Sequence, residues 1–178
     1  MTDPPEMETL YLGRFVKAHG IRGELKLYAS EDFWFEVLES QELFAERATG
    51  DDVERYPVRV EKARAHGAQY VLKIEGIEDR GDAEREVGAD LFVDLARLDV
   101  DLPERELPFQ VIGMNVRTDD GRAIGKVTGV LDSPGQRVYE VTGESGVVLI
   151  PAVPAFVVSR DEERGELTIR PIPGLIDG

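Results

Sequence analysis

Short apolar runs alternate with polar residues along most of the chain, with a period of two more often than 3.6. Because successive side chains of a strand point to opposite faces of its sheet, this pattern predicts half-buried β-strands. The runs are residues 10–12, 25–27, 58–60, 114–116, 127–131, 138–141, 147–150 and 167–172. Gly, Asp and Pro residues separate them at close spacing. Many short strands joined by turns predict an all-β fold of barrels or sandwiches.

Two stretches are expected to be helical rather than extended. Residues 31–43 mix acids with aromatic residues, which indicates either a short helix or an aromatic-rich loop. Residues 79–87 predict a single helix of about two turns, with Asp79 or Asp82 as its N-cap. Gly88 then stands where a left-handed residue is needed after the last turn.

A charged, proline-punctuated segment, residues 99–108, interrupts the apolar runs. Such a composition favours an extended, solvated chain and is typical of a connection between domains. We therefore expect an all-β protein of two small β-barrel domains, residues 1–98 and 109–178, joined by this short linker. The length of 178 residues is sufficient for two small cores.

The composition removes several kinds of chemistry. No cysteine is present, which excludes thiolate nucleophiles, disulfides, iron–sulfur clusters and cysteine zinc sites. The only histidines are His19 and His66, too few for a multi-histidine metal centre. No phosphate-binding loop, calcium loop or nucleophile elbow occurs, and no apolar run approaches the roughly 20 residues of a membrane span. We expect a cytoplasmic chain with no cofactor, no metal and no catalytic residue.

The chain is strongly acidic, with a net charge of −15. Both parts share this balance, with 13 basic and 22 acidic residues up to residue 98 and 8 and 14 after it. A phosphate backbone is repelled at long range by such a surface, so extensive binding of nucleic acid is disfavoured. Complementary potential favours a basic protein partner instead. Solubility alone is the other explanation of the charge.

One segment departs from this acidity. Residues 13–27 place Arg14, Lys17, Arg22 and Lys26 against a single acid, Glu24. Gly20 and Gly23 bracket two residues between strand-like runs, which predicts a hairpin or bulge with positive φ angles. A functional interpretation makes Arg14, Lys17, His19 and Arg22 a small cationic contact for phosphate or carboxylate. The structural interpretation is a tight turn whose polar side chains face water.

A second distinctive segment, residues 149–158, is almost continuously apolar but contains two prolines. Proline donates no hydrogen bond to a sheet, so the segment should turn sharply, burying Val153 and Phe156. A buried barrel lid is one interpretation. A partly exposed apolar docking patch at Phe156 is the other.

Several of these segments match a known family in order and spacing. They are GRFVKAHGIRGE at 13–24, IEDR at 77–80 followed by Ala83, Glu84 and Gly88, VIGM at 111–114, IGKV at 124–127, LIPAV at 149–153 and PGLID at 173–177. In these motifs the chain resembles the RimM family of bacterial ribosome maturation factors, from residue 10 to residue 178.

The resemblance implies a non-enzymatic assembly chaperone with a six-stranded N-terminal barrel and a C-terminal PRC barrel. It implies binding to the free small ribosomal subunit and to the basic ribosomal protein numbered nineteen in the subunit head, in support of 16S rRNA processing and head maturation. Family members often carry paired tyrosines just before the second domain, associated with subunit binding. Here Glu106 and Leu107 occupy those positions, so either Phe109 takes over the aromatic contact or the contact is absent.

The preferred mechanism is that the acidic second domain and linker hold the basic ribosomal protein, while the loop from Lys17 to Arg22 makes a limited contact with rRNA. An RNA-acting enzyme that works through His19 is one alternative. A PRC-type adaptor of a membrane or redox complex is another. We expect a monomer that does not bind membranes.

Overall fold

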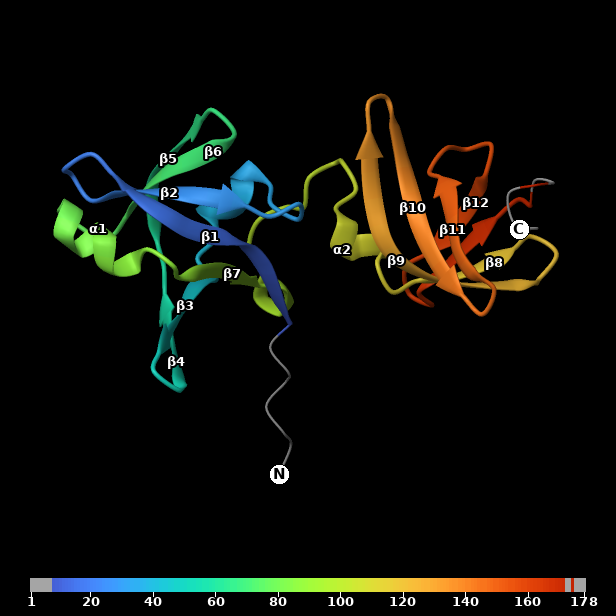
Figure 1. Ribbon diagram of the computed structural model, residues 1–178, viewed down its shortest axis with the longest axis horizontal. Helices are drawn as coiled ribbons and strands as arrows, with labels where there is room; N and C mark the ends of the chain where they lie inside the picture. The colour runs from blue at the N-terminus through green and yellow to red at the C-terminus, as the bar shows by residue number, and fades with distance from the viewer. Residues whose placement is uncertain (1–7, 172–173, 175–178) are drawn as a thin grey trace. The chain divides into compact units, whose positions relative to one another are not determined.

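A computed structural model describes residues 8–171 and 174. The chain divides into two compact units, residues 1–105 and 106–178, each with its own sheet and core (Figure 1). The fold is all-β, as the alternating pattern predicts. Within the described residues no helix is long and apolar enough to cross a membrane.

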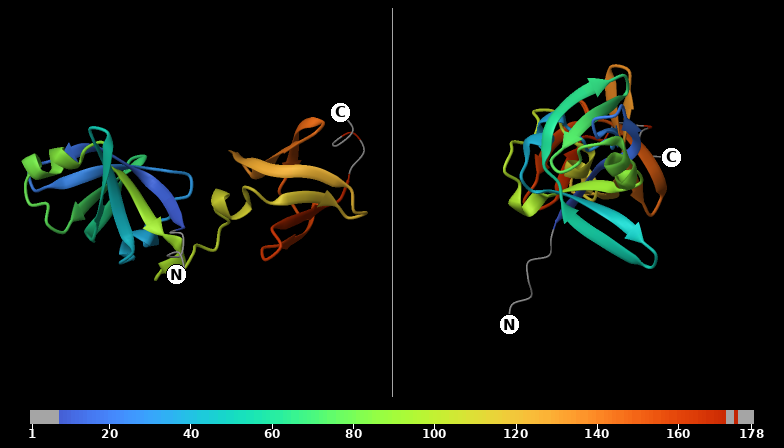
Figure 2. Two further views of the ribbon diagram at one scale, coloured as in Figure 1. Left: turned by 90° about the horizontal axis from the view of Figure 1, so that it is seen from below. Right: turned by 90° about the vertical axis from the view of Figure 1, so that its left-hand side faces the viewer.

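The first domain is built on one antiparallel sheet with the strand order β4-β3-β7-β1-β2-β6-β5. The described residues of this domain contain seven strands, one more than the family resemblance implies. They are β1 (Thr9–His19), β2 (Glu24–Ala29), β3 (Leu43–Thr49), β4 (Asp52–Pro57), β5 (Val60–His66), β6 (Gln69–Ile74) and β7 (Asp90–Asp94). The β3–β4 hairpin extends beyond the rest of the domain (Figures 1 and 2).

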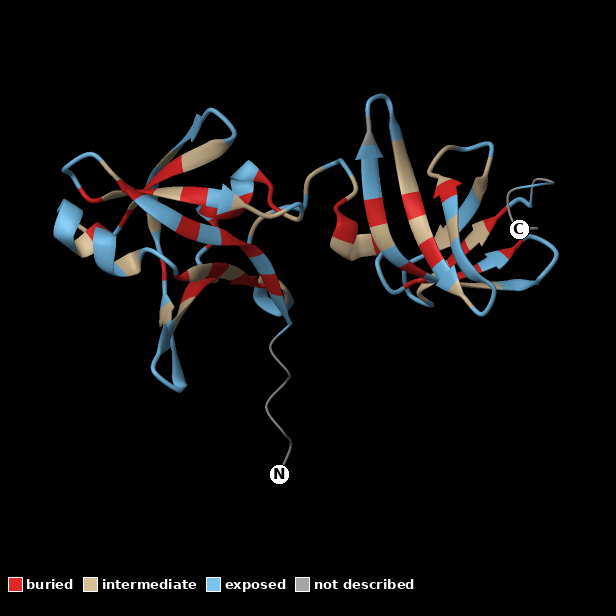
Figure 3. Ribbon diagram, in the orientation of Figure 1, coloured by how far each residue is buried: buried red, intermediate tan, exposed pale blue. Residues whose placement is uncertain are grey.

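The core of the first domain comes from the inward-facing positions of these strands. Leu12 on β1, Leu25 and Leu27 on β2, Leu72 on β6 and Leu91 on β7 are completely buried. Along β1 buried and exposed residues mostly alternate, and along β2 the buried Leu25 and Leu27 alternate with half-buried residues (Figure 3). The strand predicted at residues 58–60 is confirmed only from Val60, where β5 begins, whereas Val58 is buried at the corner between β4 and β5.

The two helical predictions have different outcomes. Helix α1 (Arg80–Glu86) is confirmed, and the side chain of Asp79, not that of Asp82, caps it by accepting from a backbone N–H at 2.8 Å. Gly88 follows with φ +96°, the left-handed conformation that the sequence predicts. Of residues 31–43 only η1 (Phe35–Glu39) is helical, as a 3₁₀ turn that buries Val37 and Leu38.

The second domain is built on a six-stranded sheet with the order β11-β10-β9-β8-β13-β12. Its elements are α2 (Pro108–Val111), β8 (Asn115–Thr118), β9 (Ala123–Ser133), β10 (Gln136–Gly143), β11 (Gly146–Pro151), β12 (Val157–Asp161) and β13 (Glu166–Ile169). The neighbours are antiparallel except β8 and β13, which run parallel. Completely buried residues of this domain include Leu107, Val111, Val141, Ile150, Leu167 and Ile169.

The apolar segment at residues 149–158 turns as the prolines predict. Strand β11 ends at Pro151, a turn follows, and β12 begins at Val157. Val153 and Phe156 are half-buried rather than buried, because the turn joins two edge strands and packs against the core from one side only. The end of the last predicted strand, Ile172, lies outside the described residues.

The segment expected as a linker makes specific contacts with the first domain. Asp99 accepts hydrogen bonds from the hydroxyl of Ser40 at 2.5 Å and from the backbone N–H of Gln41 at 3.0 Å. The indole of Trp34 donates to the backbone carbonyl of Asp101 at 3.1 Å. Residues 99–105 therefore lie within the first compact unit, and the second unit starts at Glu106.

Candidate functional site

The β1–β2 hairpin presents the cationic segment that the sequence singles out. Its turn runs through Gly20 (φ +68°) and Gly23 (φ +82°), as predicted. A side chain at residue 23 would collide with the backbone, because its Cβ would lie 2.5 Å from the carbonyl oxygen of Ile77. Ile21 and Arg22 are exposed at the tip of the turn, Ile21 to 80%. The hairpin therefore holds Arg22 in solvent on a tightly fixed turn.

Arg14 is already partnered within the domain. Its guanidinium donates to both carboxylate oxygens of Asp90 on β7, at 2.8 and 3.2 Å. This bidentate pair raises the pKa of Arg14 and engages its guanidinium. Arg14 is therefore less available to a ligand than the sequence suggests.

Lys17 is exposed because of an irregularity in β1. Phe15 faces the core, so strict alternation would turn residue 17 inward as well. The register between β1 and β2 shifts between Phe15 and Lys17, and this bulge turns Lys17 outward, opposite Lys26 of β2. Like charges directly opposite each other are unfavourable, so both ammonium groups gain from an anionic partner.

The same outer face continues onto the β5–β6 hairpin. The register forms two rows across four strands. The first row is Lys17, Lys26, Val71 and Arg64, in which Val71 is buried, and the second is His19, Glu24, Lys73 and Lys62. Cross-strand partners share a face, so four of the five lysines of the chain lie on this side of the sheet. Among the described residues, Lys17, Lys26 and Lys62 form no ion pair, whereas Arg64 donates to Glu24 at 2.6 Å.

The histidines of the chain also meet on this face. The ring centroids of His19 and His66 are 5.2 Å apart in an edge-on arrangement. Burial and the positive charges of His66, Lys26 and Arg64 lower the pKa of His19 below its usual range, although Glu24 opposes them. Within the described chain no hydroxyl is hydrogen-bonded to His19. The described residues therefore offer no nucleophile that His19 could activate, as the hypothesis of an RNA-acting enzyme would need.

We call the outer side of these strands the cationic face and define it by Lys17, His19, Lys26, Lys62, Arg64 and His66. Sequence reasoning found its β1–β2 half and missed its β5–β6 half. A signal was present, because Lys62, Arg64 and His66 occupy every second position of one strand. That spacing places three basic side chains on one face of a sheet.

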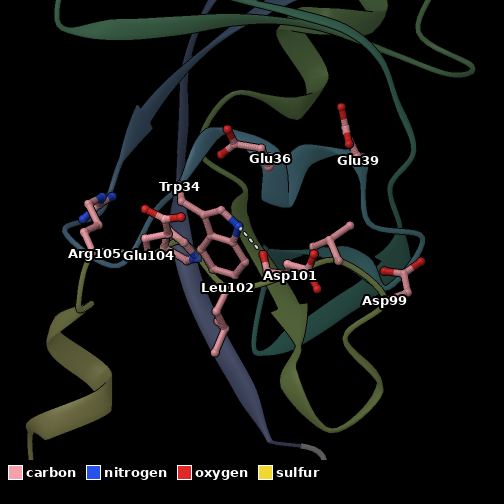
Figure 4. Close-up of a pocket in the computed structure, with 10 residues that line it drawn as sticks. Trp34, Glu36, Glu39, Asp99, Asp101, Leu102, Glu104 and Arg105 are labelled. Carbon is pink, nitrogen blue, oxygen red and sulfur yellow. Dashed lines mark hydrogen bonds between the residues drawn. The ribbon is translucent and has the colours of Figure 1, made fainter.

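A groove of about 740 Å³ with the opposite charge lies elsewhere on the first domain (Figure 4). The segment 99–105 forms one wall and η1 the other. Its lining includes five acids, one cation and two large apolar side chains: Glu36, Glu39, Asp99, Asp101, Glu104, Arg105, Trp34 and Leu102. Hydrogen bonds from Ser40 and Gln41 lower the pKa of Asp99, which keeps that carboxylate charged. The groove can hold a cationic, partly apolar segment.

The predicted contacts of the second domain lie on the outside of its core. Phe109 is half-buried on the short helix α2, and Phe156 is half-buried in the turn after β11. Phe156 packs against the barrel core. Each side chain keeps part of its surface exposed, so each remains a predicted partner contact.

The positions of the family's paired tyrosines have structural roles here. Glu106 accepts a hydrogen bond from the hydroxyl of Tyr139 at 2.6 Å and forms ion pairs with Arg137 and Arg160. Leu107 is completely buried. Both side chains act inside the second domain, which leaves Phe109 as the aromatic residue of this segment.

Fold and surface together define a tandem of two small β-barrel domains whose charges are segregated into a cationic face and an acidic groove. Residues 10–98 match the RimM N-terminal domain, and residues 108–175 match the RimM PRC barrel domain. The chain belongs to the RimM family.

Relatives named ribosome maturation factor RimM are similar to this chain over most of its length. The protein of Prosthecochloris aestuarii is 36% identical over 162 residues, which are 90% of this chain and 94% of that protein. The protein of Geobacillus kaustophilus is 35% identical over 171 residues, 93% of this chain and 95% of its own. A ribosome maturation role therefore follows from family membership.

Two solved structures are also similar. One is the crystal structure of a 16S ribosomal RNA processing protein RimM from Pseudomonas aeruginosa, with 23% identity, a TM-score of 0.44 and coverage of 93% of this chain and 98% of that one. The other is the solution structure of the N-terminal domain of RimM from Thermus thermophilus, with 23% identity, a TM-score of 0.40 and coverage of 56% and 100%.

Proposed function

We propose that this chain is a cytoplasmic assembly chaperone of the small ribosomal subunit, which supports 16S rRNA processing and maturation of the subunit head. The observation that carries this proposal is the match of both domains to the RimM family. The segregation of charge supplies the mechanism, because one surface of the first domain suits an acidic polymer and another suits a basic protein.

The acidic groove and the acidic second domain hold a basic ribosomal protein of the subunit head. From Glu106 onward the chain has 7 basic and 11 acidic residues, so the second domain adds to the negative potential of the groove. Complementary potentials accelerate encounter and suppress wrong partners. The chain thereby covers the RNA-binding surface of its client until the head is folded.

The cationic face and the exposed turn at Arg22 orient the complex on the subunit. Such a face makes a limited contact with rRNA, whereas the overall negative charge disfavours extensive binding. Client and RNA therefore use different surfaces of one small protein, and each contact can be removed separately.

The first test is sedimentation of a cell lysate on a sucrose gradient, with detection of this chain in each fraction. We expect it in the fractions of free and immature small subunits. Recovery with membranes instead would favour a PRC-type adaptor and would contradict the proposal.

The second test separates the two contacts. A Lys17→Glu, Arg22→Glu variant should lose association with the small subunit but retain binding to the purified head protein. A Glu36→Lys, Glu39→Lys variant should show the reverse, because these exposed acids line the groove. Lys126→Glu, at an exposed site of the second domain, is the matched control and should affect neither. If both double variants impair both interactions equally, the division of labour is wrong.

A further inference from the structure

Two tyrosines interrupt the cations on the outer surface of β1 and β2. Tyr28 follows Lys26 by two positions on β2, so both side chains point outward, and 61% of Tyr28 is exposed. Tyr28 lies opposite Arg14 in the β1–β2 register. The exposed part of this large ring lies in solvent between two cations and contributes nothing to folding. That part of the ring is therefore available to a ligand.

Tyr11 extends this surface on the other side of Arg14. Tyr11 is paired in register with Phe92 of β7, and Arg14 is paired with Asp90 of the same strand. Phe92 and Asp90 are two positions apart, so they point to the same face of the sheet. Tyr11 therefore shares the outer face with Arg14. The rings of Tyr11 and Phe92 lie 5.6 Å apart, which fixes the orientation of Tyr11, and 41% of Tyr11 remains exposed. Packing therefore holds one side of the ring and leaves another side free.

We propose that the outer face of β1 and β2 is a platform for single-stranded RNA, in which Tyr11 and Tyr28 stack on bases and the cationic face contacts phosphates. This inference rests on the proposed function and names the form of RNA that the face recognises. Alternation of exposed rings with cations is the chemistry of sequence-tolerant single-strand binding, because every base has a π-face and every nucleotide has a phosphate.

Stacking distinguishes a single strand from a duplex. In a duplex the bases are stacked on one another and a sheet surface reaches only phosphates and groove edges, whereas an unpaired strand can turn its bases onto tyrosine rings. A purely electrostatic face would bind both forms. The presence of two exposed rings therefore favours the single strand.

The acidic charge of the whole chain does not prevent this contact. At physiological ionic strength, charges more than about 8 Å away in solvent are largely screened. A phosphate beside Lys17 and Lys26 therefore responds to these unpaired ammonium groups rather than to distant carboxylates. Binding should be weak and should decrease steeply as salt increases.

The test measures fluorescence anisotropy of the full chain with a labelled RNA of about 12 unpaired nucleotides, and with the duplex of the same sequence. We expect tighter binding of the single strand. Tyr28→Ala should weaken it roughly 5- to 100-fold, as expected for loss of one base–aromatic stack. Tyr28→Phe keeps the ring and should retain the affinity.

Charge variants test the phosphate contacts independently of the rings. Lys17→Glu and Lys26→Glu should each weaken binding and reduce the slope of log affinity against log salt by about 0.7 per lost phosphate contact. Lys126→Glu makes the same charge change on the second domain and should leave both quantities unchanged. Circular dichroism of each variant shows that the sheet is intact.

Three results would overturn the inference: equal affinity for single strand and duplex, equal losses in Tyr28→Ala and Tyr28→Phe, or equal effects of Lys17→Glu and Lys126→Glu. Failure of the inference is distinguishable from failure of the proposed function. A chain that sediments with small subunits but does not bind the unpaired RNA contradicts only the inference. A chain that binds the RNA but never sediments with subunits contradicts only the proposed function.

Discussion

Glu106 stands at the start of the second domain and joins three of its side chains. Its carboxylate accepts from the hydroxyl of Tyr139, pairs with Arg160, and lies 3.6 Å from Arg137, whose guanidinium also donates to the backbone carbonyl of Glu106 at 2.5 Å. Burial and this carboxylate raise the pKa of Tyr139 well above its usual range, so its hydroxyl stays protonated and donates. Glu106→Ala removes this carboxylate and leaves the Tyr139 hydroxyl and the guanidinium groups of Arg137 and Arg160 without it as an acceptor.

The expected cost follows from how far the group is buried. The side chains of Glu106, Arg137 and Arg160 are only 21–22% exposed, so they lie between a surface pair and a fully buried one. Surface pairs contribute about 0–1 kcal/mol, and breaking a buried pair costs about 3–5 kcal/mol. We expect Glu106→Ala to lower the free energy of unfolding of the second domain by about 2 kcal/mol. For a domain of this size that is a decrease in Tm of about 8–16 °C.

The assay uses the position of the single tryptophan. Trp34 lies in the first domain, so its fluorescence reports the unfolding of that domain alone, whereas circular dichroism reports both sheets. Unfolding of the second domain in urea is the part of the dichroism change that has no counterpart in Trp34 fluorescence. Glu106→Ala should move that part to a lower urea concentration. Glu162→Ala removes an exposed partner of the same Arg160 and should change stability by less than about 0.5 kcal/mol. If Glu106→Ala costs no more than Glu162→Ala, the reasoning is refuted.

Three further predictions concern the first domain and use the same fluorescence or proton NMR. Gly23→Ala should destabilise it far more than Gly20→Ala, because the added methyl group meets backbone only at residue 23; equal urea midpoints would contradict this. Hydrogen bonds from a serine hydroxyl and a backbone N–H lower the pKa of Asp99 in the fold, so its stabilisation is present above the unfolded pKa of about 3.9 and is lost as pH falls through the lower folded pKa. In Asp99→Asn the urea midpoint measured by Trp34 fluorescence should depend less on pH below about 3.9. An unchanged pH dependence would count against the hydrogen bonds to Asp99. His66→Asn should raise the pKa of His19 toward its ordinary value in an NMR titration, since one of the charges that lowers it is removed; a further decrease would show that the two rings do not interact in this way.

Local sequence patterns determined much of the architecture. Alternating apolar positions predicted β1, β2 and β8 to β11 because a strand with one buried face must repeat every two residues. The cap at Asp79 and the positive φ angles of Gly20 and Gly23 were also readable, since a helix cap and a tight turn depend on residues close in the sequence. The motifs that resemble the RimM family were sufficient to indicate what both domains are.

Other features depended on contacts between distant segments. The charged composition of residues 99–105 indicated a solvated linker, yet Ser40 and Trp34 hold them against the first domain. No local pattern could reveal this, because the partners are about 60 residues away in the chain and meet only after the sheet has formed. The same holds for Glu106, whose role depends on strands that follow it.

The cationic face shows the division most directly. By itself the sequence determined that basic residues cluster around the β1–β2 turn, because composition and turn chemistry are local properties. Only the tertiary structure decided which way they point: a bulge at Val16 turns Lys17 outward, and pairing with β6 brings β5 and its Arg64 to the same face. Side-chain direction in a sheet depends on register, and register is decided by the neighbouring strand.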